Sequence, residues 1–123
     1  MKTVAIIGAS TDRNKFGNKS VRAHIKQGWK VFPVNPRADK IEGLDCYKSI
    51  LDINETLNRI SIYLHPEKGI KLLNDIAKMN PEEVFVNPGA SSEEFINKAK
   101  KLNINIIEAC SIVDIGEQSI NYY

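Results

Sequence analysis

The chain has 123 residues, 42% of them hydrophobic, which suits one domain with one core. Its formal net charge is only +2, and the lysines and acids are interspersed without a basic block, so the sequence disfavours nucleic acid as a partner. The N-terminal apolar run is too short for a signal peptide, and no later run is long enough to span a bilayer. We therefore expect a soluble protein with no membrane partner.

The cysteine pattern predicts neither a disulfide framework nor a metal site. Cys46 and Cys110 lie far apart, the chain has no Cys-x-x-Cys motif, and no histidine cluster lies near either thiol. Reduced thiols in the cytoplasm fit this pattern best, so we expect a cytoplasmic location.

The first strand and the turn that follows it are the most informative stretch. A continuous apolar run from Thr3 to Ile7 meets Gly8-Ala9-Ser10, which is typical of a doubly covered parallel strand that ends in a phosphate-binding turn. Gly8 has no Cβ, so the backbone can turn sharply and let a ligand approach. Ser10 offers a hydroxyl, and the helix that follows offers unpaired N–H groups.

The rest of the first half is less regular. After a polar loop, a helix begins at Gly17-Asn18 and ends at Gly28, and a second strand covers residues 30–35. Pro33 removes a ladder donor from that strand and predicts a bulge or a local edge. We expect residues 37–45 to be irregular and residues 46–51 to form one or two helical turns.

The second half alternates strands with helices. Strands are predicted at residues 60–64, 83–87 and 104–107. One helix begins at Pro66 and stops before Pro81, and Ser91-Ser92-Glu93-Glu94 is a capping box that starts the next. The tail from Cys110 onward is predicted to form a short closing helix or cap.

Five strands with helical connections predict an α/β fold, a Rossmann-like doubly wound five-stranded parallel sheet with helices on both faces. Ligands of such sheets bind beyond the carboxyl ends of the strands, close to the first one. The residues expected at those ends are Gly8-Ala9-Ser10, Asn35-Pro36-Arg37, Tyr63-Leu64-His65-Pro66 and Asn87-Pro88-Gly89-Ala90.

Two departures from the dinucleotide-binding pattern bear on the ligand. The Gly-x-Gly-x-x-Gly motif needs three close glycines, whereas here the next glycine after Gly8 is Gly17, so the loop is longer. Lys15 on that loop can approach a phosphate as a point charge. The second strand is followed by Asn35 and Arg37 where NAD sites carry an acid, which favours a phosphorylated ribose over free NAD.

A family resemblance rests on the motifs Gly8-Ala9-Ser10, Lys15-Phe16-Gly17, Val31-Phe32-Pro33-Val34-Asn35-Pro36, Gly43, Pro66, Pro88-Gly89-Ala90 and Cys110. In matching order from residue 3 to about residue 113, they resemble the small stand-alone CoA-binding proteins of the YccU type. These are similar to the CoA-binding domain of the succinyl-CoA synthetase alpha subunit. The resemblance implies a single CoA-binding domain over residues 1–123, with the Gly8 turn and Lys15-Phe16-Gly17 around the phosphates.

The chain departs from the family pattern at three places. Asn87 replaces the usual glutamine, His65 stands where a proline is common, and Glu108-Ala109 replaces Asp-Arg before the cysteine. The synthetase's phosphorylated histidine belongs to a separate domain, so the resemblance implies binding of CoA and not ligase activity. No catalytic activity is established for the family as a whole.

Three functions from different classes therefore remain. The first is non-catalytic binding of CoA or acyl-CoA. The second is an NADP-linked oxidoreductase or redox sensor, because Arg37 also suits a 2′-phosphate, although no catalytic pair is visible. The third is a CoA-binding subunit of a larger acyl-CoA synthetase with a partner enzyme, and a homodimer is a further arrangement that the sequence leaves open.

Each candidate residue also has a purely structural interpretation. Lys15 and Arg37 suit solvated loops, and Asn35-Pro36 suits the end of a strand. His65 is expected to be a hydrogen-bonded structural histidine, because no partner carboxylate is identifiable. Cys110 is expected to be a buried small residue, although a thiol that pairs with CoA is an alternative, and Phe16 and Trp29 are expected to pack rather than stack on adenine.

Overall fold

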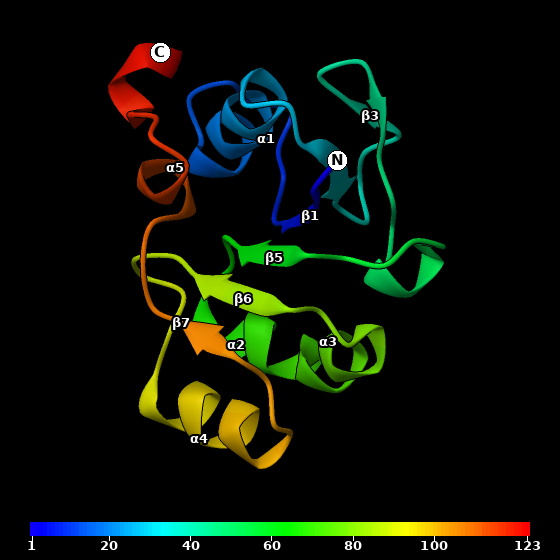
Figure 1. Ribbon diagram of the computed structural model, residues 1–123, viewed down its shortest axis with the longest axis vertical. Helices are drawn as coiled ribbons and strands as arrows, with labels where there is room; N and C mark the ends of the chain where they lie inside the picture. Colours follow the sequence, from blue (N-terminus) through cyan, green and yellow to red (C-terminus); the bar gives the residue numbers. More distant parts are fainter.

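The computed structural model describes all 123 residues, and a five-stranded parallel sheet runs through its middle (Figure 1). The sheet order is β2-β1-β5-β6-β7, and every neighbouring pair is parallel. The strands are β1 (Thr3–Ile7), β2 (Lys30–Val34), β5 (Arg59–Ile62), β6 (Glu83–Val86) and β7 (Ile106–Ile107). β1 lies inside the sheet with all five residues buried. The predicted strands are confirmed, with ends that differ by a few residues.

Helices cover both faces of the sheet, which confirms the doubly wound architecture. α1 (Phe16–Lys26) and the short α5 (Ser111–Asp114) lie on one face (Figure 1). The other face carries α2 (Pro66–Gly69), the 3₁₀ turn η2 (Ile70–Leu72), α3 (Leu73–Met79) and α4 (Glu93–Lys101). The chain ends in a 3₁₀ turn, η3 (Ser119–Tyr122), beside α1. None of these helices has both the length and the apolar character that crossing a bilayer requires.

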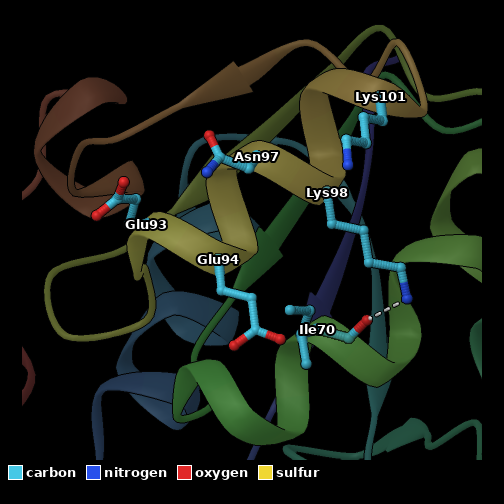
Figure 2. A pocket seen from close by; sticks show the side chains of 6 residues that line it. All are labelled: Ile70, Glu93, Glu94, Asn97, Lys98 and Lys101. Carbon is cyan, nitrogen blue, oxygen red and sulfur yellow. Dashed lines mark hydrogen bonds between the residues drawn. The ribbon is translucent and has the colours of Figure 1, made fainter.

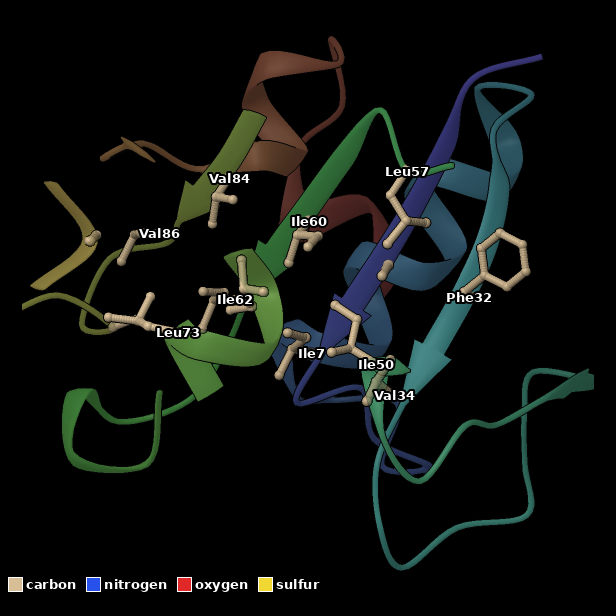
Figure 3. Packing of buried hydrophobic residues seen from close by; sticks show 14 of the residues in the cluster. Ile7, Phe32, Val34, Ile50, Leu57, Ile60, Ile62, Leu73, Val84 and Val86 are labelled. Carbon is tan, nitrogen blue, oxygen red and sulfur yellow. The ribbon is translucent and has the colours of Figure 1, made fainter. Parts of the chain in front are cut away.

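Side chains of alternate strand residues build the two halves of the core, because successive residues of a strand point to opposite faces. In β1, Ala5 and Ile7 pack on the side of α3 and α4, with Ile60 and Ile62 of β5 next to them (Figure 3). Val4 and Ile6 point the other way, against Val21 of α1. This packing fixes the register of the strands and so brings their carboxyl ends to one edge.

Pro33 is accommodated because β2 is an edge strand, as predicted. The Pro33 carbonyl accepts a hydrogen bond from the Tyr47 N–H at 2.9 Å, so Pro33 presents its nitrogen to the outer side of the strand. No ladder bond to β1 is lost there.

The prediction for residues 37–51 is wrong in two respects. Residues 40–45 form a small antiparallel hairpin of β3 (Lys40–Ile41) and β4 (Leu44–Asp45), which turns at Gly43 with φ +78°. The expected helical turns at residues 46–51 are replaced by a parallel bridge of Tyr47 to Val34 and the 3₁₀ turn η1 (Ile50–Asp52). Pairing with the open edge of β2 prevails over the local helical pattern.

Only half of the predicted capping box forms at α4. Ser92 is the N-cap, and its hydroxyl accepts the Phe95 N–H at 3.1 Å. The reciprocal carboxylate contact is absent because Phe95 occupies the third helical position after Ser92. Ser91 instead donates its hydroxyl to Glu108 at 3.0 Å.

His24 of α1 predicts a pH-dependent stability. It is fully buried against Trp29, its Nδ1–H donates to the Ser20 carbonyl at 2.8 Å, and burial with the nearby charge of Arg59 lowers its pKa to about 4. The unfolded chain binds a proton at His24 below about pH 6.5, whereas the folded chain does so only near pH 4. The free energy of unfolding should therefore fall by roughly 2–3 kcal/mol through this residue as pH drops through that window.

Urea unfolding at pH 7.0 and 4.5 measures this effect, and His24→Gln, which keeps a donor but does not titrate, is the comparison. The variant should lose less stability between the two pH values than the wild type. Equal losses would show that His24 is not the titrating group.

Candidate functional site

A cavity of about 710 Å³ lies where the carboxyl ends of β1, β2 and β5 meet. β2 lies on one side of β1, and the later strands β5, β6 and β7 lie on the other, so the strand order reverses at β1. Ligands of open α/β sheets bind at such a reversal point. The cavity is lined by the β1 turn Gly8-Ala9-Ser10, by Lys15, by Asn35-Pro36-Arg37 after β2, and by Tyr63-Leu64-His65 after β5.

The lining of this cavity is strongly basic. Its cationic side chains are Lys15, Arg37, Lys48, Lys68 and Lys71. No aspartate or glutamate lines it, although acids make up almost half of the charged residues of the chain. Because like charges gathered in a hollow produce a strong local potential, the cavity is suited to a ligand with several negative charges.

Two glycines bring the start of α1 directly onto the end of β1. Gly8 has φ +85°, and a Cβ there would lie 2.4 Å from the Tyr63 carbonyl oxygen. A Cβ on Gly17 would lie 2.1 Å from the Gly8 carbonyl oxygen, closer than van der Waals contact permits. Gly17 therefore serves close helix–strand packing, the role of the third glycine of a dinucleotide-binding turn, although a longer loop separates it from Gly8.

Main-chain N–H groups around this turn have no acceptor in the protein. Those of Ala9 and Ser10 after β1, and of Phe16 and Gly17 at the start of α1, donate no hydrogen bond. The N-cap residue Lys15 provides no side-chain cap, and the first turn of α1 contains no acid. Unpaired N–H groups and the positive end of the helix dipole are the usual means of binding a phosphate.

The loop between β1 and α1 has a shape set by its own side chains. The Ser10 hydroxyl accepts the Asp12 N–H at 3.0 Å, and the Asp12 carboxylate accepts the Asn14 N–H at 3.0 Å. The Ser10 hydroxyl still has its own proton to donate, because it acts only as an acceptor in that bond. The loop thus holds Ser10 and Lys15 at the cavity wall.

Asn35 uses its side chain to connect β2 to the phosphate turn. Its amide donates to the Ala9 carbonyl at 2.8 Å, and its carbonyl oxygen accepts the Arg37 N–H at 2.8 Å. Asn35 therefore shapes the cavity wall, whereas the exposed Arg37 retains a free guanidinium at the rim.

The β5 end contributes a half-buried tyrosine and an exposed histidine. The Tyr63 hydroxyl bonds with the Ser111 hydroxyl at 3.0 Å, and burial raises the pKa of Tyr63, so the phenol stays neutral. The prediction of a hydrogen-bonded structural histidine at position 65 is wrong, because the His65 imidazole is exposed and bonds to no protein group. Its side chain lines the cavity.

Some predicted residues lie outside this cavity. These are Phe16, Gly17, Pro66, Asn87, Pro88 and Gly89. Asn87 is buried, where its amide donates to the Ser61 hydroxyl at 2.8 Å and its oxygen accepts the Ser111 N–H at 2.9 Å. It joins β5, β6 and α5, while Pro88 and Gly89 form an exposed turn.

The sequence interpretation missed three of the lysines. Lys68 and Lys71 are three residues apart in the helical segment after β5, and this spacing puts both on one face. The helical spacing in the sequence could therefore have predicted that the two lysines lie together. Lys48 gave no such signal, because it reaches the cavity only through the bridge of Tyr47 to β2.

Other polar features of the surface do not match this site. A hollow of about 660 Å³ lies along α4. Figure 2 shows the side chains that line it, which are Ile70, Glu93, Glu94, Asn97, Lys98 and Lys101. The two glutamates and two lysines of this hollow balance in charge, and Lys98 already donates to the Ile70 carbonyl at 3.3 Å.

Cys110 lies at the N-cap of α5 and packs near Ile112, away from the basic cavity. No three His, Cys, Asp or Glu side chains gather closely enough to hold a metal ion.

Residues 2–116 match a family model described as a CoA binding domain. The chain belongs to this family. The match confirms the resemblance predicted from the sequence motifs, and it covers the whole sheet together with the turn after β1.

Relatives of the family include both larger enzymes and chains of similar size. The chain is 33% identical over 114 residues to an acetate–CoA ligase (ADP-forming) of Methanocaldococcus jannaschii, covering 86% of this chain and 16% of that one. A conserved hypothetical protein of Pyrococcus furiosus has a TM-score of 0.85 at 28% identity, over 93% of this chain and 99% of that one. A dinucleotide-forming acetyl-coenzyme A synthetase of Ca. Korarchaeum cryptofilum, in its apo form, has a TM-score of 0.76 at 25% identity, over 88% and 26%. The chain thus spans about a sixth of the curated relatives' length.

The Gly8–Gly17 contact predicts that Gly17→Ala disrupts the site. Because the added Cβ would lie 2.1 Å from the Gly8 carbonyl oxygen, α1 must move away from β1. We expect a loss of about 2–4 kcal/mol in the free energy of unfolding, measured by urea denaturation. Lys78→Ala, at an exposed position of α3, should change the free energy of unfolding by less than about 0.5 kcal/mol. Equal stability of Gly17→Ala and the wild type would contradict the packing role.

Proposed function

We propose that this chain binds CoA or acyl-CoA in the cavity at the β1, β2 and β5 ends and does not itself catalyse a reaction. The main support is the lining of this cavity, which has five cationic side chains, no carboxylate and unpaired main-chain N–H groups at the Gly8 turn. CoA has a pyrophosphate and a 3′-phosphate, so it presents several negative charges to such a lining. Membership of the CoA binding domain family supports the same ligand.

The arrangement of donors supports a specific orientation. The pyrophosphate is proposed to lie on the N–H groups of Ala9 and Ser10 and on the start of α1, with Lys15 beside it. The 3′-phosphate is proposed to lie against Arg37, which follows the second strand as the ribose-binding residue does in related sheets. Lys68 and Lys71, which line the same cavity, are proposed to contact the phosphates as well.

A second hollow supports a path for the pantetheine arm. It measures about 540 Å³, includes Pro66 and Ser92, and shares His65 and Lys68 with the basic cavity. We propose that the arm leaves the cavity past His65 and Pro66 toward the turn of Asn87, Pro88 and Gly89.

The relatives also support a role within a larger assembly. Several are named ADP-forming CoA ligases, and the chain aligns with 14% to 17% of their length. We propose that the chain, as a single domain, supplies a CoA-binding surface to a partner enzyme that performs the chemistry. We propose a cytoplasmic location for this role, because both cysteines are free thiols and the cytoplasm keeps thiols reduced.

Arg37 gives the most direct test of the orientation. Calorimetric titration of CoA and of dephospho-CoA into wild type and Arg37→Ala should show about tenfold weaker CoA binding by the variant and little change for dephospho-CoA. This pattern follows because only CoA carries the 3′-phosphate. Equal losses for both ligands would contradict the assignment, and Lys100→Ala on α4 is the charge-matched control.

Competition with NADP distinguishes the two ligand classes. Arg37 also suits a 2′-phosphate, so NADP is the relevant competitor. We expect CoA to displace NADP at equal concentration, because the longer loop and Lys68 and Lys71 offer charge for additional phosphate contacts. Stronger retention of NADP, or no CoA binding at millimolar concentration, would overturn the proposed function.

A further inference from the structure

The loop Ser10–Lys15, here called the phosphate loop, is exposed and held by a small number of side chains. Asn18 of α1 is buried, and its amide donates to the Ser10 carbonyl at 2.8 Å and to Glu42 of the β3–β4 hairpin at 3.1 Å. The Asn18 oxygen accepts the Arg22 Nε–H at 2.7 Å. Every polar atom of the Asn18 side chain is therefore occupied, and its orientation is fixed.

Arg22 connects the phosphate loop to the far end of the chain. Its Nη2 donates to the Arg13 carbonyl at 2.7 Å and to the Tyr122 carbonyl at 2.6 Å. Nη2 has two hydrogens, so each carbonyl receives one, and the planar guanidinium holds the loop, Asn18 and η3 in one geometry. Arg22 thus links the main chain at residue 13 to the main chain at residue 122.

Residues 117–123, here called the C-terminal segment, have their own attachments to α1 (Figure 1). The Tyr122 ring packs with Ala23 and Ile112, and its hydroxyl donates to Glu117 at 2.6 Å. The centre of the Tyr123 ring lies 3.0 Å from the Lys19 Nζ, which is buried and has no hydrogen-bond partner. The segment thus covers the first turns of the same helix whose start faces the cavity.

We infer that the C-terminal segment orders the phosphate loop through Arg22 and thereby strengthens phosphate binding in the cavity. Arg22 does not line the cavity, so it acts as a positioning residue. When Tyr122 leaves α1, Arg22 loses one of its two carbonyl acceptors and its contact with the Tyr122 ring, so it holds the Arg13 carbonyl less firmly and the loop that carries Lys15 becomes more mobile. A flexible loop must be ordered at each binding event, which weakens binding. The affinity part of this inference rests on the proposed function.

Tyr122→Ala tests the coupling, because it removes the ring that packs the segment against α1 and against the Arg22 guanidinium, while it substitutes neither Arg22 nor any cavity residue. In the ligand-free protein, NMR order parameters of the Asp12, Asn14 and Lys15 amides should fall below 0.6, while those of Val84–Val86 in β6 stay near 0.85. CoA affinity measured by calorimetry should fall about tenfold. Arg22→Lys, which keeps the charge but not the planar fork, should reproduce both changes.

Ile120→Ala is the matched control, because Ile120 is 69% exposed in the same segment and should change neither quantity. Tyr122→Phe, which loses only the bond to Glu117, gives a smaller change in the same direction and replaces Tyr122→Ala if that variant unfolds. Unchanged loop order in these variants, or reduced order with unchanged affinity, would overturn the coupling. A wild type that does not bind CoA would instead remove the proposed function, and the loop measurement still decides whether the segment orders the loop.

Discussion

The contact between Gly17 and the Gly8 carbonyl is the constraint on which the site depends. Since a Cβ at either glycine would overlap a main-chain oxygen, no other residue lets α1 begin directly against the end of β1. That approach brings the unpaired N–H groups of α1 and of the Gly8 turn to one edge of the sheet. The positive end of the helix dipole then acts on the same space as the cationic side chains.

The charge of the cavity comes from segments that are far apart in the sequence. Lys15 follows β1, Arg37 follows β2, and Lys68 follows β5. Parallel strands direct their carboxyl ends to one edge, so residues that follow different strands meet there. A net charge of only +2 is therefore compatible with a local basic cavity, because the acids lie elsewhere on the surface.

Polar contacts join the last part of the chain to the sheet. Arg59 is buried, donates to Glu83 and to Asp114 at 2.6 Å each, and stacks against Phe85 with 4.0 Å between guanidinium and ring centre. Ser111 joins the Asn87 network described above. These contacts are directional, so they require a defined geometry of the groups that they join. They fix where α5 lies, and the C-terminal segment follows from it.

The sequence by itself determined the strands, the doubly wound fold and the turn after β1, because apolar runs, glycines and helix starts are local signals. It also placed Ser10, Lys15 and Arg37 at the cavity. Only the tertiary structure decided that Tyr47 pairs with the edge of β2, that Lys48 faces the cavity, and that Asn87 is a buried connector. Each of these depends on which segments pair across the sheet, and local propensity does not encode such long-range pairing.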